Sequence, residues 1–181
     1  MKEKHALVIG GTGMLADVSL WLADTGYQVS VIGRTEEKHL NLVKNARNPQ
    51  NVNHLIVDYT NYALLEDQVR KALANMGPIS LVVSWTPIRQ SLETVNRIVA
   101  EQKDRWTLYQ IKGSRRYFER ESLLVPVNCE HRSIYLGFII EANHSRWLTN
   151  QEISEGVIKS IKEDHTESIV GTLHPYDKRP S

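Results

Sequence analysis

The sequence has little that would belong to a secreted or membrane protein. Its single cysteine, Cys129, excludes an intrachain disulfide framework and fits a reducing compartment. No stretch approaches the roughly 18 apolar residues that cross a bilayer. The short apolar run after the charged first residues is broken by glycines, unlike a signal segment. We therefore expect a cytoplasmic protein without membrane contact, and we interpret Cys129 as an ordinary buried or loop thiol.

Strong charge of one sign and metal-ligand spacings are also lacking. The chain carries 22 Lys and Arg against 21 Asp and Glu, a net charge of +1, so no large field would recruit nucleic acid. The 7 histidines are scattered, without His-x-x-x-His or a paired cysteine, and we expect no metal site. Neither Gly-x-Ser-x-Gly nor a glycine loop ending in Gly-Lys-Ser/Thr occurs, which leaves hydrolase and P-loop functions without support.

Apolar strands alternate with amphipathic helices along the chain. We predict strands at 5–9, 28–32, 52–57, 79–84, 106–111, 133–140 and 168–173, and helices at 14–25, from 36, at 61–76, 91–103 and 149–161. Thr149-x-x-Glu152 has the pattern of a capping box for the last helix. Such alternation predicts an α/β fold, a doubly wound and mostly parallel sheet with helices on both faces. We expect residues 1–181 to form a single domain.

A glycine-rich turn joins the first strand to the first helix. Gly11-Thr-Gly13-Met-Leu-Ala16 matches Gly-x-Gly-x-x-Gly/Ala, and the frame Gly10-x-x-Gly13-x-x-Ala16 fits as well. The small residues permit a tight turn, close approach of the backbone to a pyrophosphate, and packing of helix on strand. The pyrophosphate would bind the backbone amides at the positive end of the helix dipole. We therefore predict dinucleotide binding by Gly10, Gly11, Thr12, Gly13, Met14 and Leu15; the alternative is a glycine turn in an unliganded α/β domain.

Arg34 follows the second predicted strand, where the choice between the two nicotinamide dinucleotides is made. An acidic side chain there would bind the ribose 2′-hydroxyl of NAD. A guanidinium instead offers several donors and a permanent charge to the 2′-phosphate of NADP. The sequence therefore favours NADP over NAD as cofactor. The alternative is that Arg34 is a solvated loop residue.

Two further strand ends contribute candidate cofactor residues. Asp58 follows the third predicted strand, where it would either accept a hydrogen bond from the adenine amino group, with Tyr59 beside the ring, or serve as a turn acid. Ser84 and Trp85 close the fourth strand at the same edge and would lie against the cofactor ribose. Trp85 would equally suit simple packing.

These features resemble the short-chain dehydrogenase/reductase family. The resemblance depends on the turn from Gly10 to Ala16, on Arg34, Asp58 and Ser84, and on the order of elements over residues 1–114; it is looser beyond. It implies a Rossmann-type domain that binds NAD(P). In complete members a serine ends the fifth strand, and a Tyr-x-x-x-Lys on the next helix supplies the proton.

Ser114 matches the family's serine position, but the sequence contains no Tyr-x-x-x-Lys. The interval between the fifth and sixth predicted strands is also too short for the helix that carries that motif. The chain therefore resembles an atypical, shortened member. Lys112, Ser114 and Tyr117, just after the fifth predicted strand, are the best substitute catalytic residues. Arg115, Arg116 and His144 are further candidates, the arginines for an anionic substrate and the histidine for proton transfer.

Two functions are expected from this pattern. One is an NADP(H)-dependent oxidoreductase acting on a small carbonyl or hydroxyl substrate with a non-standard proton donor. The alternative is a non-catalytic NADP(H)-binding or redox-sensing module, supported by the missing motif. Lyase or isomerase chemistry on the same scaffold stays open, because a fold does not fix a reaction. Family analogy and the apolar helix faces favour a homo-oligomer.

Overall fold

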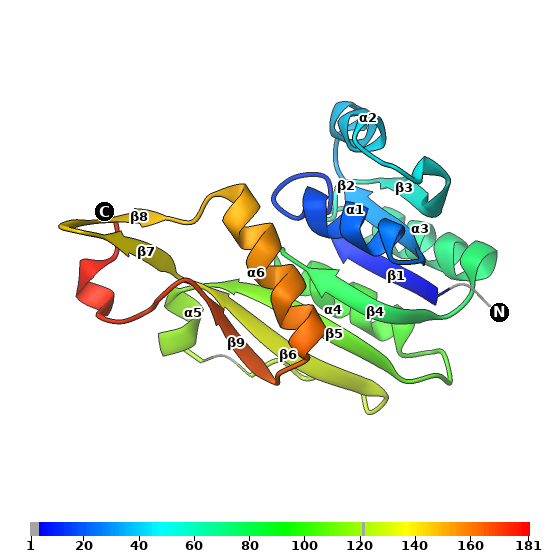
Figure 1. The fold of residues 1–181 in the computed structure, drawn as a ribbon. Coiled ribbons are helices and arrows are strands. Elements are labelled where there is room, and N and C mark those ends of the chain that lie inside the picture. The colour runs from blue at the N-terminus through cyan, green and yellow to red at the C-terminus, as the bar shows by residue number, and fades with distance from the viewer. Residues whose placement is uncertain (1–3, 121) are drawn as a thin grey trace.

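A seven-stranded parallel sheet lies at the centre of the computed structural model, which describes residues 4–120 and 122–181 (Figure 1). The charged residues 1–3 lie outside this description. The strands of the sheet are β1 (Lys4–Ile9), β2 (Tyr27–Gly33), β3 (Val52–Ile56), β4 (Ile79–Ser84), β5 (Trp106–Gly113), β6 (Cys129–Leu136) and β9 (Glu167–Val170). Their order across the sheet is β3-β2-β1-β4-β5-β6-β9. The chain thus reverses direction across the sheet between β3 and β4, which places a crevice at the carboxyl ends of β1 and β4.

Helices cover both faces of this sheet, as the alternation predicts. They are α1 (Ala16–Asp24), α2 (Glu36–Lys44), α3 (Tyr62–Met76), α4 (Arg89–Val99), α5 (Arg115–Phe118) and α6 (Asn150–Glu163), with short 3-10 turns η1 (Pro49–Asn51) and η2 (Tyr176–Lys178). Helices α1, α2 and α6 pack on one core, and α3 and α4 pack on the other. The predicted capping box is present, since Thr149 and Glu152 bond each other's backbone amides at the start of α6. The predicted fold class is confirmed.

One predicted strand, 133–140, is wrong. The chain forms two strands there, β6 in the central sheet and β7 (Phe138–Glu141), which pairs antiparallel with β8 (His144–Trp147) in a separate hairpin. Gly137 lies between the two strands. A larger residue does not fit there, because a Cβ would collide with the backbone of Thr172. Phe138 and Thr172 exchange two backbone hydrogen bonds of 2.9 and 2.8 Å at this crossing. Apolar composition alone does not reveal such a crossing, since both strands are apolar.

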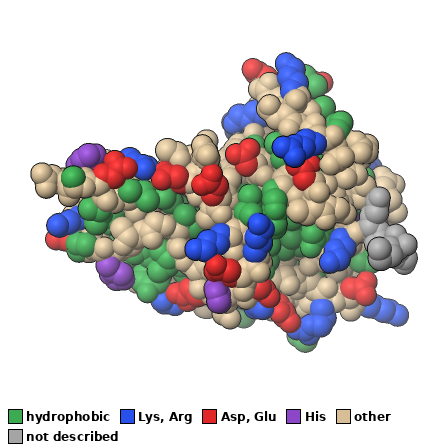
Figure 2. Space-filling view, in the orientation of Figure 1, with side chains coloured by type: hydrophobic (Ala, Val, Ile, Leu, Met, Phe, Trp, Pro, Cys, Tyr) green, Lys and Arg blue, Asp and Glu red, His purple; other side chains and the backbone are tan. Residues whose placement is uncertain are grey.

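The C-terminal segment from Thr172 onward is held under this hairpin, beside α5 (Figure 1). The hydroxyl of Ser145 in β8 donates to the carbonyl of Lys178 at 2.5 Å, and the rings of Phe118 and Tyr176 lie 4.3 Å apart. Figure 2 shows hydrophobic side chains on the surface at this end of the molecule. The C-terminal segment is therefore packed against the carboxyl end of the sheet.

Among the described residues of the connection between β5 and β6, the only helix is the four-residue α5. Strand β5 is longer than predicted and includes Lys112 and Gly113. The expectation that this interval has no room for a long helix is confirmed. Among the residues described, no helix combines the length and apolarity needed to cross a bilayer.

Candidate functional site

The glycine turn uses three of its glycines in three different ways. Gly10 has a φ of +82°, and a Cβ there would lie 2.9 Å from the carbonyl oxygen of Trp85. A Cβ at Gly11 would press into Ser19 at 2.5 Å, so this glycine permits α1 to pack on the sheet. A Cβ at Gly13 would meet nothing within 4 Å. The space over Gly13 is open to a cleft, which is the arrangement that a pyrophosphate needs.

Two serine side chains hold carbonyl groups of the turn in place, while several of its backbone amides remain available to a ligand. The hydroxyl of Ser19 donates to the carbonyl of Gly11 at 3.0 Å, and that of Ser154 in α6 donates to the carbonyl of Met14 at 3.1 Å. In the described part of the chain, the amides of Thr12, Met14 and Leu15 have no backbone acceptor. Leu15 has a fully buried side chain, so only its amide can serve a ligand. Free amides at a helix start form an anion-binding site.

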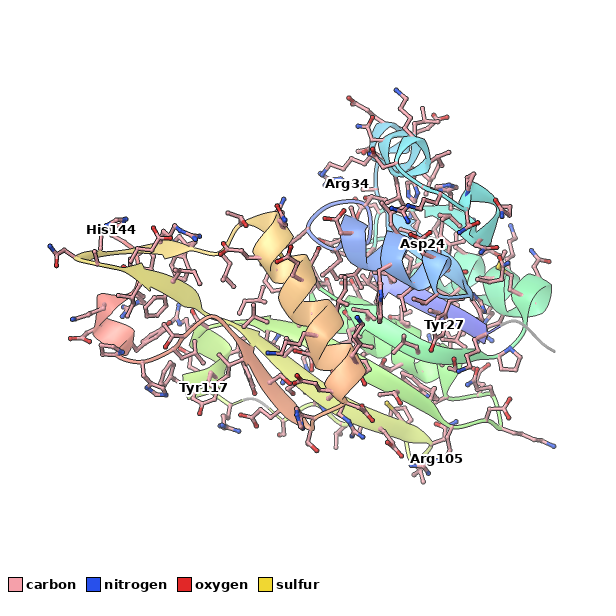
Figure 3. The ribbon with its side chains drawn as sticks, in the orientation of Figure 1. Asp24, Tyr27, Arg34, Arg105, Tyr117 and His144 are labelled. Carbon is pink, nitrogen blue, oxygen red and sulfur yellow. The ribbon has the colours of Figure 1, made fainter. Side chains whose placement is uncertain are left out.

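A cleft of about 410 Å³ extends from this turn across the ends of β2 and β3. Arg34 lines it and lies beside the turn between β1 and α1 (Figure 3). Lys38, one turn into α2, lines the same cleft and was not predicted from the sequence. The available signal was its position in the first turn of the helix that begins two residues after Arg34. Figure 2 shows Lys and Arg side chains over α2 at the top of the molecule.

Asp58 lines this cleft and also serves as a turn acid. Its Oδ1 accepts hydrogen bonds from the amide and hydroxyl of Thr60, at 2.9 and 2.7 Å. These bonds, helped by the charge of Arg34, lower the pKa of Asp58. Of the two alternatives, the turn role is therefore present, and contact with adenine stays a prediction. Tyr59 lines the cleft as well.

The two residues predicted at the end of β4 differ in position. Trp85 lies at the carboxyl edge, where it lines both the first cleft and a second cavity. Ser84 is 1% exposed, and its hydroxyl has no hydrogen-bond partner among the described residues. Trp85 can therefore contact a cofactor, whereas Ser84 is buried and does not line the cleft.

The second cavity, about 270 Å³, lies between the end of β5, the start of α4 and α5. It shares Trp85 and Pro87 with the first cleft, so the two hollows adjoin at these residues. Lys112 and Gly113 of β5 line it, together with Arg116 of α5. A dinucleotide with one end bound at Arg34 would direct its other, reactive end toward this cavity.

Lys112 lies in a buried polar row on β5 and β6. Its ammonium group donates to Ser133 Oγ at 3.1 Å and lies 5.3 Å from the centre of the Tyr135 ring. His131, next in the row, bonds Gln110 at 2.9 Å. Burial, then the charges of Lys112 and Arg132, lowers the pKa of His131 to about 4. His131 is therefore uncharged at neutral pH.

The depressed pKa of His131 predicts a loss of stability in mild acid. His131 binds a proton near pH 6.5 in the unfolded chain but only near pH 4 in the folded chain. The free energy of unfolding therefore has its full value above pH 6.5 and decreases as the pH falls toward 4. At about pH 5 the loss amounts to roughly 2 kcal/mol. Urea unfolding of the parent and of His131→Gln, each above pH 6.5 and at about pH 5, measures this loss of stability. The variant should lose correspondingly less stability; parallel losses in both proteins would contradict the assignment.

Ser114, directly after β5, meets a residue that the sequence analysis missed. The hydroxyl oxygens of Ser114 and Tyr176 lie 3.3 Å apart. Tyr176 comes from the C-terminal segment. Its ring packs at a tilt of 42° against Phe118, and the guanidinium of Arg179 lies 4.4 Å from the ring centre. Two adjacent hydroxyl groups can donate together to one carbonyl oxygen. No local sequence signal places Tyr176 there, because it follows Ser114 by 62 residues.

The other candidate proton donors lie elsewhere. Tyr117 packs its ring against Tyr135, 5.2 Å between centres, and does not line the second cavity. His144 lies in β8 at the tip of the hairpin, far from Tyr117 (Figure 3), and its side chain is 70% exposed. Its expected place directly after a strand of the main sheet is wrong, because the chain turns into the hairpin at Gly137.

Two other features of the described chain are not assigned to the candidate site. A hollow of about 670 Å³ lies among His5, Gly77 and Arg105, at the amino edge of the sheet. Ligands of open α/β sheets bind at the opposite, carboxyl edge, so we do not assign this hollow as the site. Cys129 is buried, and burial raises the pKa of its thiol to about 12, which is unfavourable for a nucleophile.

Comparison with solved structures identifies the fold. A putative short-chain dehydrogenase/reductase from Sinorhizobium meliloti matches with a TM-score of 0.68 and 13% identity, over 97% of this chain and 98% of that chain. A variant of actinorhodin polyketide ketoreductase, solved with NADPH, matches with a TM-score of 0.70 and 12% identity, over 94% and 97%. The fold is that of the short-chain dehydrogenases/reductases. No protein-family model and no curated protein matches the sequence.

This short-chain dehydrogenase/reductase fold agrees with the resemblance drawn from the glycine turn and strand order. A protein from Brucella melitensis, of the glucose/ribitol dehydrogenase type, gives a TM-score of 0.69 at 12% identity, over 92% and 93% of the two chains. The likeness at these identities concerns the course of the backbone. The roles of individual side chains must be argued from this chain's own geometry.

Proposed function

We propose that this protein binds NADP(H) across the carboxyl edge of the sheet and reduces a small carbonyl compound. The observation that carries the proposal is the pairing of open space over Gly13 with an arginine-lined cleft that continues to Trp85. The residues fit the cofactor: the amides of Thr12, Met14 and Leu15 would bind the pyrophosphate. Arg34 and Lys38 would bind the 2′-phosphate, and Tyr59 would lie beside the adenine.

When bound, the reduced nicotinamide supplies a hydride to the carbonyl carbon of the substrate. The chain must then stabilise negative charge on the carbonyl oxygen and deliver a proton to it. Lys112, Ser114 and Tyr117 are the candidates from the sequence, and Tyr176 adds a hydroxyl 3.3 Å from Ser114. We assign the proton to the Ser114–Tyr176 pair, because it brings two hydroxyl groups together directly after β5, whereas the ring of Tyr117 packs against Tyr135.

Arg34 should determine the cofactor preference. Removing a hydrogen bond to a charged group costs about 1.5 to 3 kcal/mol, or roughly a tenfold to hundredfold change in affinity. Arg34→Ala should therefore weaken NADPH binding by about this factor while NADH binding stays nearly unchanged. Calorimetric titration of both dinucleotides measures the ratio.

Arg47→Ala is the matched control, because Arg47 is exposed and does not line the cleft, yet its removal changes the net charge equally. Equal weakening of NADPH and NADH by Arg34→Ala would show that Arg34 does not bind the 2′-phosphate. An effect of Arg47→Ala as large as that of Arg34→Ala would assign the loss to overall charge.

A non-catalytic NADP(H)-binding module is the second candidate. The four-residue length of α5 favours it, because the described residues between β5 and β6 form no long helix that could carry Tyr-x-x-x-Lys. This function predicts tight NADPH binding without oxidation of NADPH over a broad carbonyl panel. Substrate-dependent oxidation above the rate in free solution would exclude it.

A further inference from the structure

Two histidines that the proposed function does not use lie next to the loop that carries Arg34. His39 of α2 is 2% exposed, although its ring is polar. Its Nε2 lies 3.0 Å from the carbonyl oxygen of Gly33, and its Nδ1 lies 2.7 Å from Nδ1 of the half-buried His54 on β3. The ring of His39 therefore joins α2 to the end of β2 and to β3.

The two contacts of His39 fix where the protons of the pair lie. A carbonyl oxygen can only accept, so Nε2 of His39 donates to Gly33. Burial lowers the pKa of both His39 and His54, and both rings are therefore neutral at neutral pH. In a neutral ring only one nitrogen carries a proton, so Nδ1 of His39 accepts and Nδ1 of His54 donates. The two rings thus hold opposite tautomers.

Gly33 is the residue directly before Arg34, and it is held on two sides. A Cβ at Gly33 would collide with the side chain of Thr12 in the glycine turn and would lie 2.9 Å from Nε2 of His39. Its carbonyl also accepts the amide of Val57 at 3.1 Å. Gly33 and Thr12 both line the dinucleotide cleft. His39 therefore fixes the backbone from which the Arg34 side chain starts.

The position of this backbone matters because a guanidinium binds a phosphate through hydrogen bonds of defined geometry. A binding side chain keeps such geometry only when the residues behind it are held by packing and hydrogen bonds. The 2′-phosphate is also the one group that distinguishes NADP from NAD. A shift of the Gly33 carbonyl should therefore change the preference between the two dinucleotides more than it changes dinucleotide binding in general.

We propose that His39 is a positioning residue for cofactor preference. It holds the peptide unit between Gly33 and Arg34 where the guanidinium can reach the 2′-phosphate, and His54 fixes the tautomer that His39 needs for this. The inference rests on the proposed function, since it acts through the binding of NADP(H) at Arg34.

His39→Phe tests this role, because it removes both hydrogen bonds and keeps a ring in the buried space. The Gly33 carbonyl retains the amide of Val57, and the half-buried His54 can bond water, so we expect the variant to fold. The ratio of NADPH affinity to NADH affinity should fall about tenfold. His39→Gln should restore the ratio to within about threefold of the parent, since its amide offers both a donor and an acceptor. Calorimetric titration with each dinucleotide measures the ratio.

His5→Phe is the matched control. His5 is 1% exposed and also bonds one carbonyl and one side chain, Gly77 at 2.9 Å and Ser30 at 2.7 Å, but it does not line the dinucleotide cleft. Its loss should lower the thermal midpoint and leave the affinity ratio within about twofold of the parent. An equal fall of the ratio in His5→Phe and His39→Phe would assign the effect to stability and overturn the inference.

A double variant tests whether His39 acts through Arg34. In the Arg34→Ala background, His39→Phe should change the ratio by less than about twofold, because the side chain that it positions is gone. A further tenfold fall there would show that His39 acts by another route. If His39→Phe does not fold, His54→Leu takes its place. It frees the tautomer of His39 and should lower the ratio about threefold, whereas an unchanged ratio would overturn the inference.

Nitrogen-15 NMR of the histidine rings in the unliganded protein tests the pair without a cofactor. His39 should carry its proton on Nε2 and His54 on Nδ1, with the signals assigned by their loss in His39→Gln and His54→Leu. A bare Nε2 on His39 would overturn the inference. If the parent binds neither dinucleotide, the proposed function fails and the inference fails with it. If the parent prefers NADPH and His39→Phe keeps that preference, the inference alone fails.

Discussion

Replacing Gly13 by glutamate is expected to abolish NADPH binding while leaving the free energy of unfolding nearly unchanged. A Cβ at Gly13 meets nothing within 4 Å, so the substitution does not disturb the packing of the turn. The new side chain projects into the space that the pyrophosphate would occupy and adds a negative charge there. The anion site at the helix start would then repel the ligand it is built to attract. We expect affinity to fall at least about a hundredfold, or roughly 3 kcal/mol.

Gly13→Ala separates size from charge in this experiment. It adds a methyl group in the same open space and should weaken NADPH binding less than glutamate does, with the same thermal midpoint as the parent. Calorimetric titration with NADPH and thermal unfolding are measured on all three proteins. If Gly13→Glu binds NADPH like the parent, the pyrophosphate does not lie on this turn, and the proposed cofactor site is wrong.

The parts of the site that the sequence predicts are those made by consecutive residues. The glycine turn lies between a strand and a helix within residues 4–24, so spacing alone places Gly10, Gly13 and Ala16 relative to one another. Arg34 and Asp58 follow strands whose parallel pairing brings their carboxyl ends to one edge. Local periodicity and one rule of sheet topology therefore suffice for the proposed cofactor half of the site.

The proposed substrate half depends on chain crossings that no local sequence pattern predicts. Gly137 ends β6 and turns the chain into a hairpin, and the crossing at Thr172 then directs the C-terminal segment back to α5. Tyr176 reaches Ser114 only because of these two crossings. Lys112 was expected after β5, but it is the buried end of that strand. Tertiary contacts distant in sequence decide each of these placements.

Tyr176→Phe is expected to reduce the rate of carbonyl reduction about a hundredfold or more, without changing the affinity for NADPH. The substitution removes the hydroxyl that lies 3.3 Å from Ser114 Oγ and keeps the ring that packs against Phe118. Tyr176 does not line the dinucleotide cleft, so the dissociation constant of NADPH should stay the same. Single-turnover oxidation of NADPH with a reactive ketone or 2-oxo acid measures the chemical step apart from binding.

Tyr117→Phe is the matched control, since it removes the same hydroxyl from the neighbouring aromatic cluster. Its ring contacts with Tyr135 and Phe118 persist, and we expect the rate to change by less than about threefold. If Tyr117→Phe is the damaging variant and Tyr176→Phe is not, the proton comes from α5. Ser114→Ala should lower the rate as well, and combining it with Tyr176→Phe should cost less than the product of the two single effects. Such non-additivity is expected when two hydroxyl groups stabilise the same oxygen, because removing one also removes most of the contribution of the other.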